Sequence, residues 1–137
     1  MEVTALLCDY AEEIRGKLYI MGGGWSRIVV NRPVDMTLAV KIAVPWDQTN
    51  VPHSISAKLL TEDGQPVRIE DQVVQLDGRI EVGRPPGLRQ GTALDAPIAL
   101  RFQGLDLPPG SYSWHFDIDG KEQARLPFEA VQGGGTP

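Results

Sequence analysis

Apolar and polar residues alternate along several short stretches of this chain, and the clearest of these runs from Met36 to Val44. A period of two indicates a β-strand that buries one of its two faces. Asp-Gly dipeptides stand between several stretches, and they favour tight hairpin turns because both residues reach positive φ angles easily. These dipeptides are Asp63-Gly64, Asp77-Gly78 and Asp119-Gly120. The sequence therefore predicts an all-β fold that is built largely of hairpins.

The same pattern predicts strands at residues 3–8, 17–21, 25–30, 36–44, 55–59, 98–102, 112–118 and 124–130. Three segments lack the alternation. Asp9–Gly16 is predicted to be a polar connection, Val73–Val82 a short hairpin, and Arg84–Pro97 a long irregular loop. The inward-facing residues that we expect to form one contiguous core are Leu38, Val40, Ile42, Leu100, Tyr112, Trp114, Phe116 and Phe128.

Three consecutive glycines, at residues 22–24, lie between the predicted strands at residues 17–21 and 25–30. Glycine within a strand pattern indicates a bulge or a close approach of another part of the backbone. The interpretation that we favour is a bulge that bends one long strand across two sheets. The alternative is a phosphate-binding loop, but no Lys or Ser/Thr follows at the required spacing.

The number and spacing of the strands favour an antiparallel two-sheet β-sandwich. Gly110-Ser111-Tyr112 is similar to the tyrosine corner of immunoglobulin-like sandwiches, which adds support for that class. Pro127 lacks a backbone N–H, so the last strand is predicted to lie at a sheet edge. We expect a single immunoglobulin-like domain over residues 1–131 and a flexible glycine-rich tail over residues 132–137.

Composition narrows the classes of partner. The 137 residues include 18 acidic and 13 basic side chains, for a net charge of −5, and this charge argues against nucleic-acid binding. The single cysteine, Cys8, cannot form an intramolecular disulfide. We find neither a signal-peptide pattern nor an apolar run of membrane-spanning length, so the expected location is the cytoplasm, or the virion if a phage encodes the chain.

Two segments resemble those of a known group of proteins. Leu6-Leu7-Cys8-Asp9-Tyr10-Ala11, followed by the stretch from Gly16 to Gly22, is similar to the start of an uncharacterised family of small bacterial and phage-encoded domains. Leu107-Pro108-Pro109-Gly110-Ser111-Tyr112, with the later Asp119-Gly120, resembles the last hairpin of that family. The family has no assigned function, so the resemblance implies a fold and no active residues.

No residue pattern predicts a catalytic, cofactor or metal site. The two histidines, His53 and His115, have no spacing that unites them with Cys8 or a group of carboxylates. Asp117-Ile118-Asp119 is a lone Asp-x-Asp spacing, and turn formation already explains Asp119. Cys8 is interpreted as a packed and inert strand cysteine. We therefore expect no catalytic residue, no cofactor and no metal ligand.

The remaining candidates are interaction residues. Trp25 and Trp46 flank loops, where aromatic side chains bind sugars or proteins or else cap the ends of a core. Arg84, Leu88 and Arg89 lie in the long loop. The preferred hypothesis is a non-catalytic module for protein–protein assembly in a phage particle or bacterial complex, with a protein partner or a second copy. The alternatives are a carbohydrate- or small-molecule-binding module and an uncharacterised hydrolase.

Overall fold

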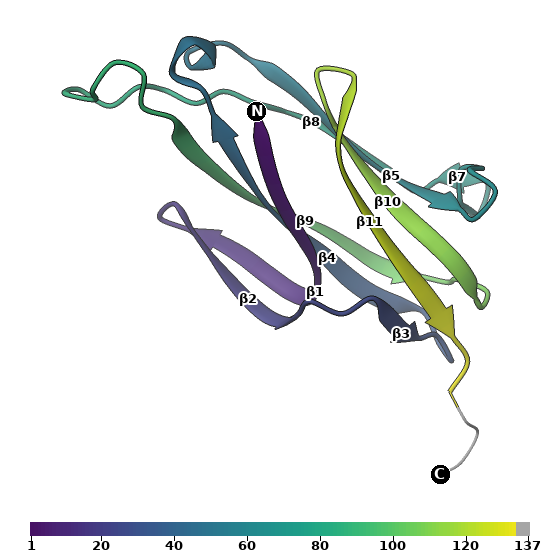
Figure 1. The fold of residues 1–137 in the computed structure, drawn as a ribbon. Coiled ribbons are helices and arrows are strands. Elements are labelled where there is room, and N and C mark those ends of the chain that lie inside the picture. The colour runs from purple at the N-terminus through teal and green to yellow at the C-terminus, as the bar shows by residue number, and fades with distance from the viewer. Residues whose placement is uncertain (134–137) are drawn as a thin grey trace.

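Two β-sheets form the body of the protein in this computed structural model, which describes residues 1–133 (Figure 1). The four-stranded sheet has the order β2 (Lys17–Gly23), β1 (Glu2–Ile14), β4 (Val34–Val44) and β9 (Leu94–Leu105). The five-stranded sheet has the order β3 (Arg27–Val29), β11 (Lys121–Val131), β10 (Gly110–Ile118), β5 (His53–Thr61) and β8 (Gln75–Ile80). A small hairpin of β6 (Arg68–Ile69) and β7 (Gln72–Val73) and a 3₁₀ turn, η1 (Trp46–Gln48), complete the fold. Residues 1–133 contain no α-helix, so the all-β prediction is confirmed.

The core lies between the inner faces of the two sheets. All eight predicted core residues belong to this one cluster, which confirms the predicted alternation. Trp114 on β10 is fully buried, with its ring centroid 4.2 Å from that of Phe102 on β9. Its indole Nε1 donates to the Met36 sulfur on β4 at 3.3 Å. Trp114 therefore links the two sheets through both a tilted aromatic contact and a hydrogen bond.

Two of the three predicted Asp-Gly turns are confirmed. Asp119 and Gly120 have φ angles of +52° and +80° and join β10 to β11, while Gly64 has a φ of +78° in the turn after β5. The prediction of a turn at Asp77-Gly78 was wrong. Both residues lie within β8, where they pair with Ser56 and Ile55 of β5. A Cβ atom at Gly78 would make an ordinary contact with the Ile55 side chain. This is the contact expected between paired residues of neighbouring strands, and it does not indicate a turn.

Two other predicted segments were assigned incorrectly. Residues 9–14 continue β1 instead of forming a polar connection, because they pair with β2 along an exposed hairpin that has little buried face to show alternation. The long loop ends before Leu94, and Pro97 pairs with Lys41 inside β9. Pro97 is tolerated there because β9 is an edge strand of its sheet.

The glycines at 22–24 lie where the chain leaves one sheet for the other. β2 belongs to the four-stranded sheet and β3 to the five-stranded sheet, so the chain does pass between the sheets here. It does so as two strands separated by residues 24–26, so the prediction of one long bulged strand was wrong. β3 pairs with β11 in parallel, which is an exception to the predicted antiparallel arrangement. β11 lies between β3 and β10, so the prediction that the last strand forms a sheet edge holds only for its first part: pairing with β3 begins at Glu129, and Pro127 pairs with Ser113 of β10 alone. Residues 134–137 of the predicted tail lie outside the described residues.

Candidate functional site

Large apolar side chains are exposed on the hairpin that β1 and β2 form. Seven such side chains are exposed within residues 1–133, and four of them lie on this hairpin. They are Ile14, Tyr19, Ile20 and Met21, with exposed fractions of 44%, 53%, 41% and 67%, and we call them the hairpin patch. Figure 1 shows the hairpin in purple at one side of the molecule, with β2 outermost. An apolar patch on a projecting element is typical of an interaction surface.

One face of the hairpin is fixed to the rest of the protein by a second apolar cluster. Its buried members, Cys8, Ala11 and Ala39, pack with the half-buried Leu6, Leu18 and Ala99. The Arg101 guanidinium of β9 lies 4.8 Å from the centre of the Tyr10 ring, a cation–π contact on the face that Tyr10 shares with its partner Met21. Because side chains alternate along a strand, Tyr19 and Met21 point to the side of β2 opposite Leu18. The hairpin is therefore packed against the protein on the face of Leu18, while Tyr19 and Met21 on the other face stay exposed.

Glycine is needed where β2 runs back past β1. A Cβ atom at Gly23 would lie 2.8 Å from Ile20 Cγ2 and 3.0 Å from Leu6 Cδ1. At Gly22 the φ angle is +61°, and a Cβ atom would meet the Asp9 carboxylate. The glycine run thus allows the close approach that places Leu6 and Cys8 beneath β2.

The free edge of β2 has less protection against pairing than the other sheet edges. Proteins block exposed edges with charges, prolines or very short strands. Edge strand β9 contains Pro97, edge strand β8 contains Asp77 and Arg79, and β3 is three residues long. In β2, by contrast, no charged residue or proline follows Lys17 before the strand ends at Gly23. The backbone of β2 is therefore the edge best suited to accept another strand.

Thr37 lies beneath the hairpin and provides a test of this packing. Its side chain is fully buried next to Cys8, and its Oγ1 has no hydrogen-bond partner. Valine has nearly the same shape and removes the unpaired hydroxyl, so Thr37→Val is expected to stabilise the fold by about 1 kcal/mol. Urea denaturation of both proteins measures the change, and a clear loss of stability would show that the hydroxyl has a partner.

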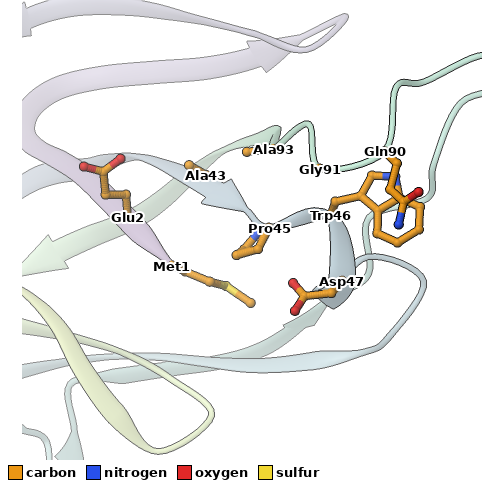
Figure 2. A pocket seen from close by; sticks show the side chains of 9 residues that line it. All are labelled: Met1, Glu2, Ala43, Pro45, Trp46, Asp47, Gln90, Gly91 and Ala93. Carbon is orange, nitrogen blue, oxygen red and sulfur yellow. The ribbon is translucent and has the colours of Figure 1, made fainter.

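A second surface feature is an open pocket of about 700 Å³ at the end of the sheets where β4 finishes. Figure 2 shows the side chains that line it: Met1, Glu2, Ala43, Pro45, Trp46, Asp47, Gln90, Gly91 and Ala93. The Arg84 guanidinium lies 3.8 Å from the Trp46 ring centre, and its Nε donates to Thr49 Oγ1 at 2.6 Å. The long loop is thereby fastened to η1, and Arg84 already covers part of the Trp46 ring.

His53 is buried at the start of β5, and both of its ring nitrogens are engaged. Nδ1 lies 2.7 Å from Asp119 Oδ2, and Nε2 lies 2.8 Å from the Gln48 carbonyl oxygen. Because both partners are acceptors, the protonated ring donates to both of them, and the pKa of His53 is raised by the Gln48 carbonyl and by Asp119. The expectation that His53 lies in a loop before the strand at residues 55–59 was wrong, because β5 begins at His53. Sequence spacing did not reveal the pair, because its members are 66 residues apart.

The protonation of His53 gives a pH-dependent contribution to stability. A raised pKa in the folded state means that this contribution is complete below the unfolded pKa of about 6.5 and is lost as pH rises through the higher folded value. Urea denaturation between pH 5 and pH 9 is expected to show this decline in the wild type and a flatter profile in His53→Asn. Equal profiles for the two proteins would contradict the assignment.

His115 lies on the outer face of β10, with Nδ1 2.5 Å from Glu122 Oε1. Glu122 also accepts from Arg125 Nη2 at 3.0 Å, and its pKa is lowered by His115 first and then by Arg125. The hydrogen bonds of both histidines therefore go to carboxylates and, for His53, to a backbone carbonyl. Within residues 1–133, no group of three His, Cys, Asp or Glu side chains is placed to hold a metal ion.

The model of a protein family of unknown function, DUF6941, matches residues 3–131. The chain belongs to DUF6941. This assignment confirms the resemblance to an uncharacterised family over most of the chain, while the bacterial or phage origin stays a prediction. No curated protein matches the sequence. Because DUF6941 has no described activity, the function of the chain has to be inferred from its surface.

The predicted interaction residues do not form one surface. Trp46 and Arg84 are in contact, whereas Trp25 is half-buried, with its ring centroid 6.1 Å from that of Phe128 in an edge-to-face arrangement. Trp25 thus caps the core near β3, the alternative that the sequence left open. Leu88 is half-buried and Arg89 is exposed in the loop between β8 and β9.

Within the described part of the chain, no helix is long and apolar enough to cross a membrane.

The hairpin patch escaped the sequence analysis, although a signal for it was present. Leu18-Tyr19-Ile20-Met21 is an unbroken apolar run in which both faces of the strand are apolar. Such a run is typical of a strand that is covered on both sides. In this structure the run lies at a sheet edge with only one side covered, and that combination identifies the surface.

Proposed function

We propose that this member of DUF6941 is a non-catalytic module for protein–protein assembly, and that it binds an extended protein segment along the free edge of β2. The observation on which the proposal rests is the hairpin patch on an edge strand whose single charge, Lys17, lies at its start. Main-chain hydrogen bonds from an added strand would give affinity, and the alternating Tyr19 and Met21 side chains would give specificity.

The bonding of the histidines supports a non-catalytic function. A general base must be free to take a proton from a nucleophile or from water. Both nitrogens of His53 already face acceptors, and the Nδ1 of His115 is engaged by Glu122. The buried thiol of Cys8 donates to the Thr37 carbonyl at 3.4 Å, and burial raises its pKa, so the reactive thiolate is disfavoured.

The assembly proposal is tested by capture from the native host with tagged wild type, Met21→Lys and Val29→Lys as baits. Met21 and Val29 are both exposed large apolar residues, but Val29 lies on β3. We expect a protein or a second copy to be retained by the wild type and by Val29→Lys and lost from Met21→Lys, because lysine at an edge opposes pairing. Retention by all three baits, or by none, would contradict the proposal.

A second candidate, a small-molecule or carbohydrate site, is favoured by the pocket beside Trp46. The pocket volume is within the range of ligand sites, and aromatic rings with carboxylate and amide groups are typical of sugar recognition. It ranks second because the pocket is open and Arg84 already occupies part of the Trp46 ring. Binding of a glycan panel that is lost in Trp46→Ala would favour this function.

We also infer that the two sheets belong to the immunoglobulin-like class. The supporting contact is the Tyr112 hydroxyl, which donates to the Pro108 carbonyl oxygen at 2.6 Å. A tyrosine that bonds to the backbone a few residues upstream is the tyrosine-corner arrangement of that class. A cytoplasmic or virion location remains the prediction from the sequence.

A further inference from the structure

The regular part of β2 could pair in antiparallel fashion with the same segment of a second copy of the protein. Gly16 and Gly22 have φ angles of +78° and +61°, so the extended backbone between these two glycines runs over Lys17–Met21. Tyr19 is the middle residue of that stretch. An antiparallel pair of two such stretches, related by a two-fold axis at Tyr19, uses the whole stretch in both copies and leaves no residue without a partner.

The side chains agree with this register. Lys17 of one copy would face Met21 of the other, and the two Tyr19 rings would face each other as an aromatic cross-strand pair. Lys17 is the sole charged residue of β2, and the two-fold axis places the two Lys17 residues at opposite ends of the paired strands. No like charges therefore meet across the pair.

Residues of β1 add charge complementarity. Glu12 pairs with Tyr19 and Tyr10 pairs with Met21, so these four side chains share one face of the hairpin. In the two-fold pair, Lys17 of the other copy joins that face beside Met21, one row along from Glu12 and with β2 between them. The two Cα atoms are then roughly 12 Å apart, because strands lie about 4.8 Å apart and alternate residues about 6.8 Å apart. The extended Lys17 and Glu12 side chains can bridge this separation, so opposite charges meet on the same face at both ends of the pair.

We propose that the segment bound by β2 is β2 of a second copy, so that the protein forms a two-fold dimer centred on Tyr19. The inference rests on the proposed function, because it names the partner of the same edge. The pairing joins the two four-stranded sheets into one continuous sheet of eight strands. Five residues a side are few compared with the roughly 20–30 a side of a standard interface, so the dimer is weak and forms as concentration rises.

Site-specific cross-linking tests the register directly. In Tyr19→Cys the two introduced thiols would face each other, with Cα atoms about 4.5–5.5 Å apart. That separation lies within the roughly 4.4–6.8 Å that disulfides span. Oxidation with diamide, which removes two electrons and two protons from the thiol pair, is expected to give a covalent dimer in high yield. Non-reducing gels and mass spectrometry measure the yield.

The matched control is Lys17→Cys, which is also an exposed position on β2. Its two copies would be offset by four residues, roughly 14 Å along the strand, so Lys17→Cys alone should not form a dimer. A mixture of Lys17→Cys and Met21→Cys should cross-link to each other. Wild type, whose Cys8 is fully buried, gives the background.

The outcomes separate the two proposals. A monomer at all concentrations by light scattering, or equal cross-linking of Tyr19→Cys and Lys17→Cys, would overturn the two-fold dimer. If the Met21-dependent capture from the host then identifies a different protein, the assembly function stands and the partner is not a second copy. If neither a dimer nor a captured protein depends on Met21, both proposals fail.

Discussion

Replacing Trp114 with alanine is expected to lower the free energy of unfolding by about 3–5 kcal/mol. The side chain is fully buried, packs against the Phe102 ring and donates to the Met36 sulfur. Its removal leaves a cavity between the sheets in addition to the lost transfer free energy, because a close-packed core relaxes only in part. Urea denaturation measures the loss.

Trp25→Ala serves as the comparison, because Trp25 is half-buried and packs at the margin of the same core. Truncating the half-buried Trp25 side chain removes less buried apolar surface, and solvent can fill the space that it leaves. The loss in free energy of unfolding should therefore be clearly smaller than for Trp114→Ala. If Trp114→Ala changes the stability by less than about 1 kcal/mol, the register of β10 described above is wrong.

Valine at Gly22 and valine at Gly78 are expected to have opposite consequences. Gly22 has a φ of +61°, which costs an L-residue about 1–2 kcal/mol, and a β-branched side chain would also displace Asp9. Gly78 has extended backbone, and its Cβ would make an ordinary contact with Ile55 at 3.6 Å. Gly22→Val should therefore destabilise the protein by at least that amount, whereas Gly78→Val should leave its stability unchanged or higher.

Comparing the Gly22→Val and Gly78→Val variants also decides between two interpretations of Asp77-Gly78. If the dipeptide formed a hairpin turn, as its sequence suggests, Gly78 would need a positive φ and valine would be destabilising. Equal losses of stability for Gly22→Val and Gly78→Val in parallel urea denaturations would contradict the assignment of Asp77-Gly78 to β8.

The alternation of side chains predicted the interior of the protein well. The pattern from Met36 to Val44 identified β4 and its buried face, because that strand packs its inner face against the opposite sheet. The same holds for β10. Where a strand leaves the core, the pattern is lost. Residues 12–17 at the tip of the hairpin are exposed on both faces, so their sequence, apart from Ile14, is polar or glycine and resembles a loop.

The contacts between distant segments could not be predicted from one sequence. His53 and Asp119 meet because β5 and β10 are neighbours in one sheet, and no local spacing encodes that pairing. Trp46 and Arg84 likewise meet across the end of the sheets. The edge position of β2 depends on strand order, which periodicity does not determine, and the hairpin patch was missed for that reason.

Backbone hydrogen exchange along β2 tests the central claim most directly. In the dilute protein, amides of Lys17–Met21 that face the free edge have no strand to bind and should exchange rapidly. At high concentration, or with a captured partner, these amides should become protected, while the edges of β8 and β9 and the Arg84–Ala93 loop stay unchanged. Protection confined to that loop or to the β9 edge, with β2 still exchanging rapidly, would contradict the account.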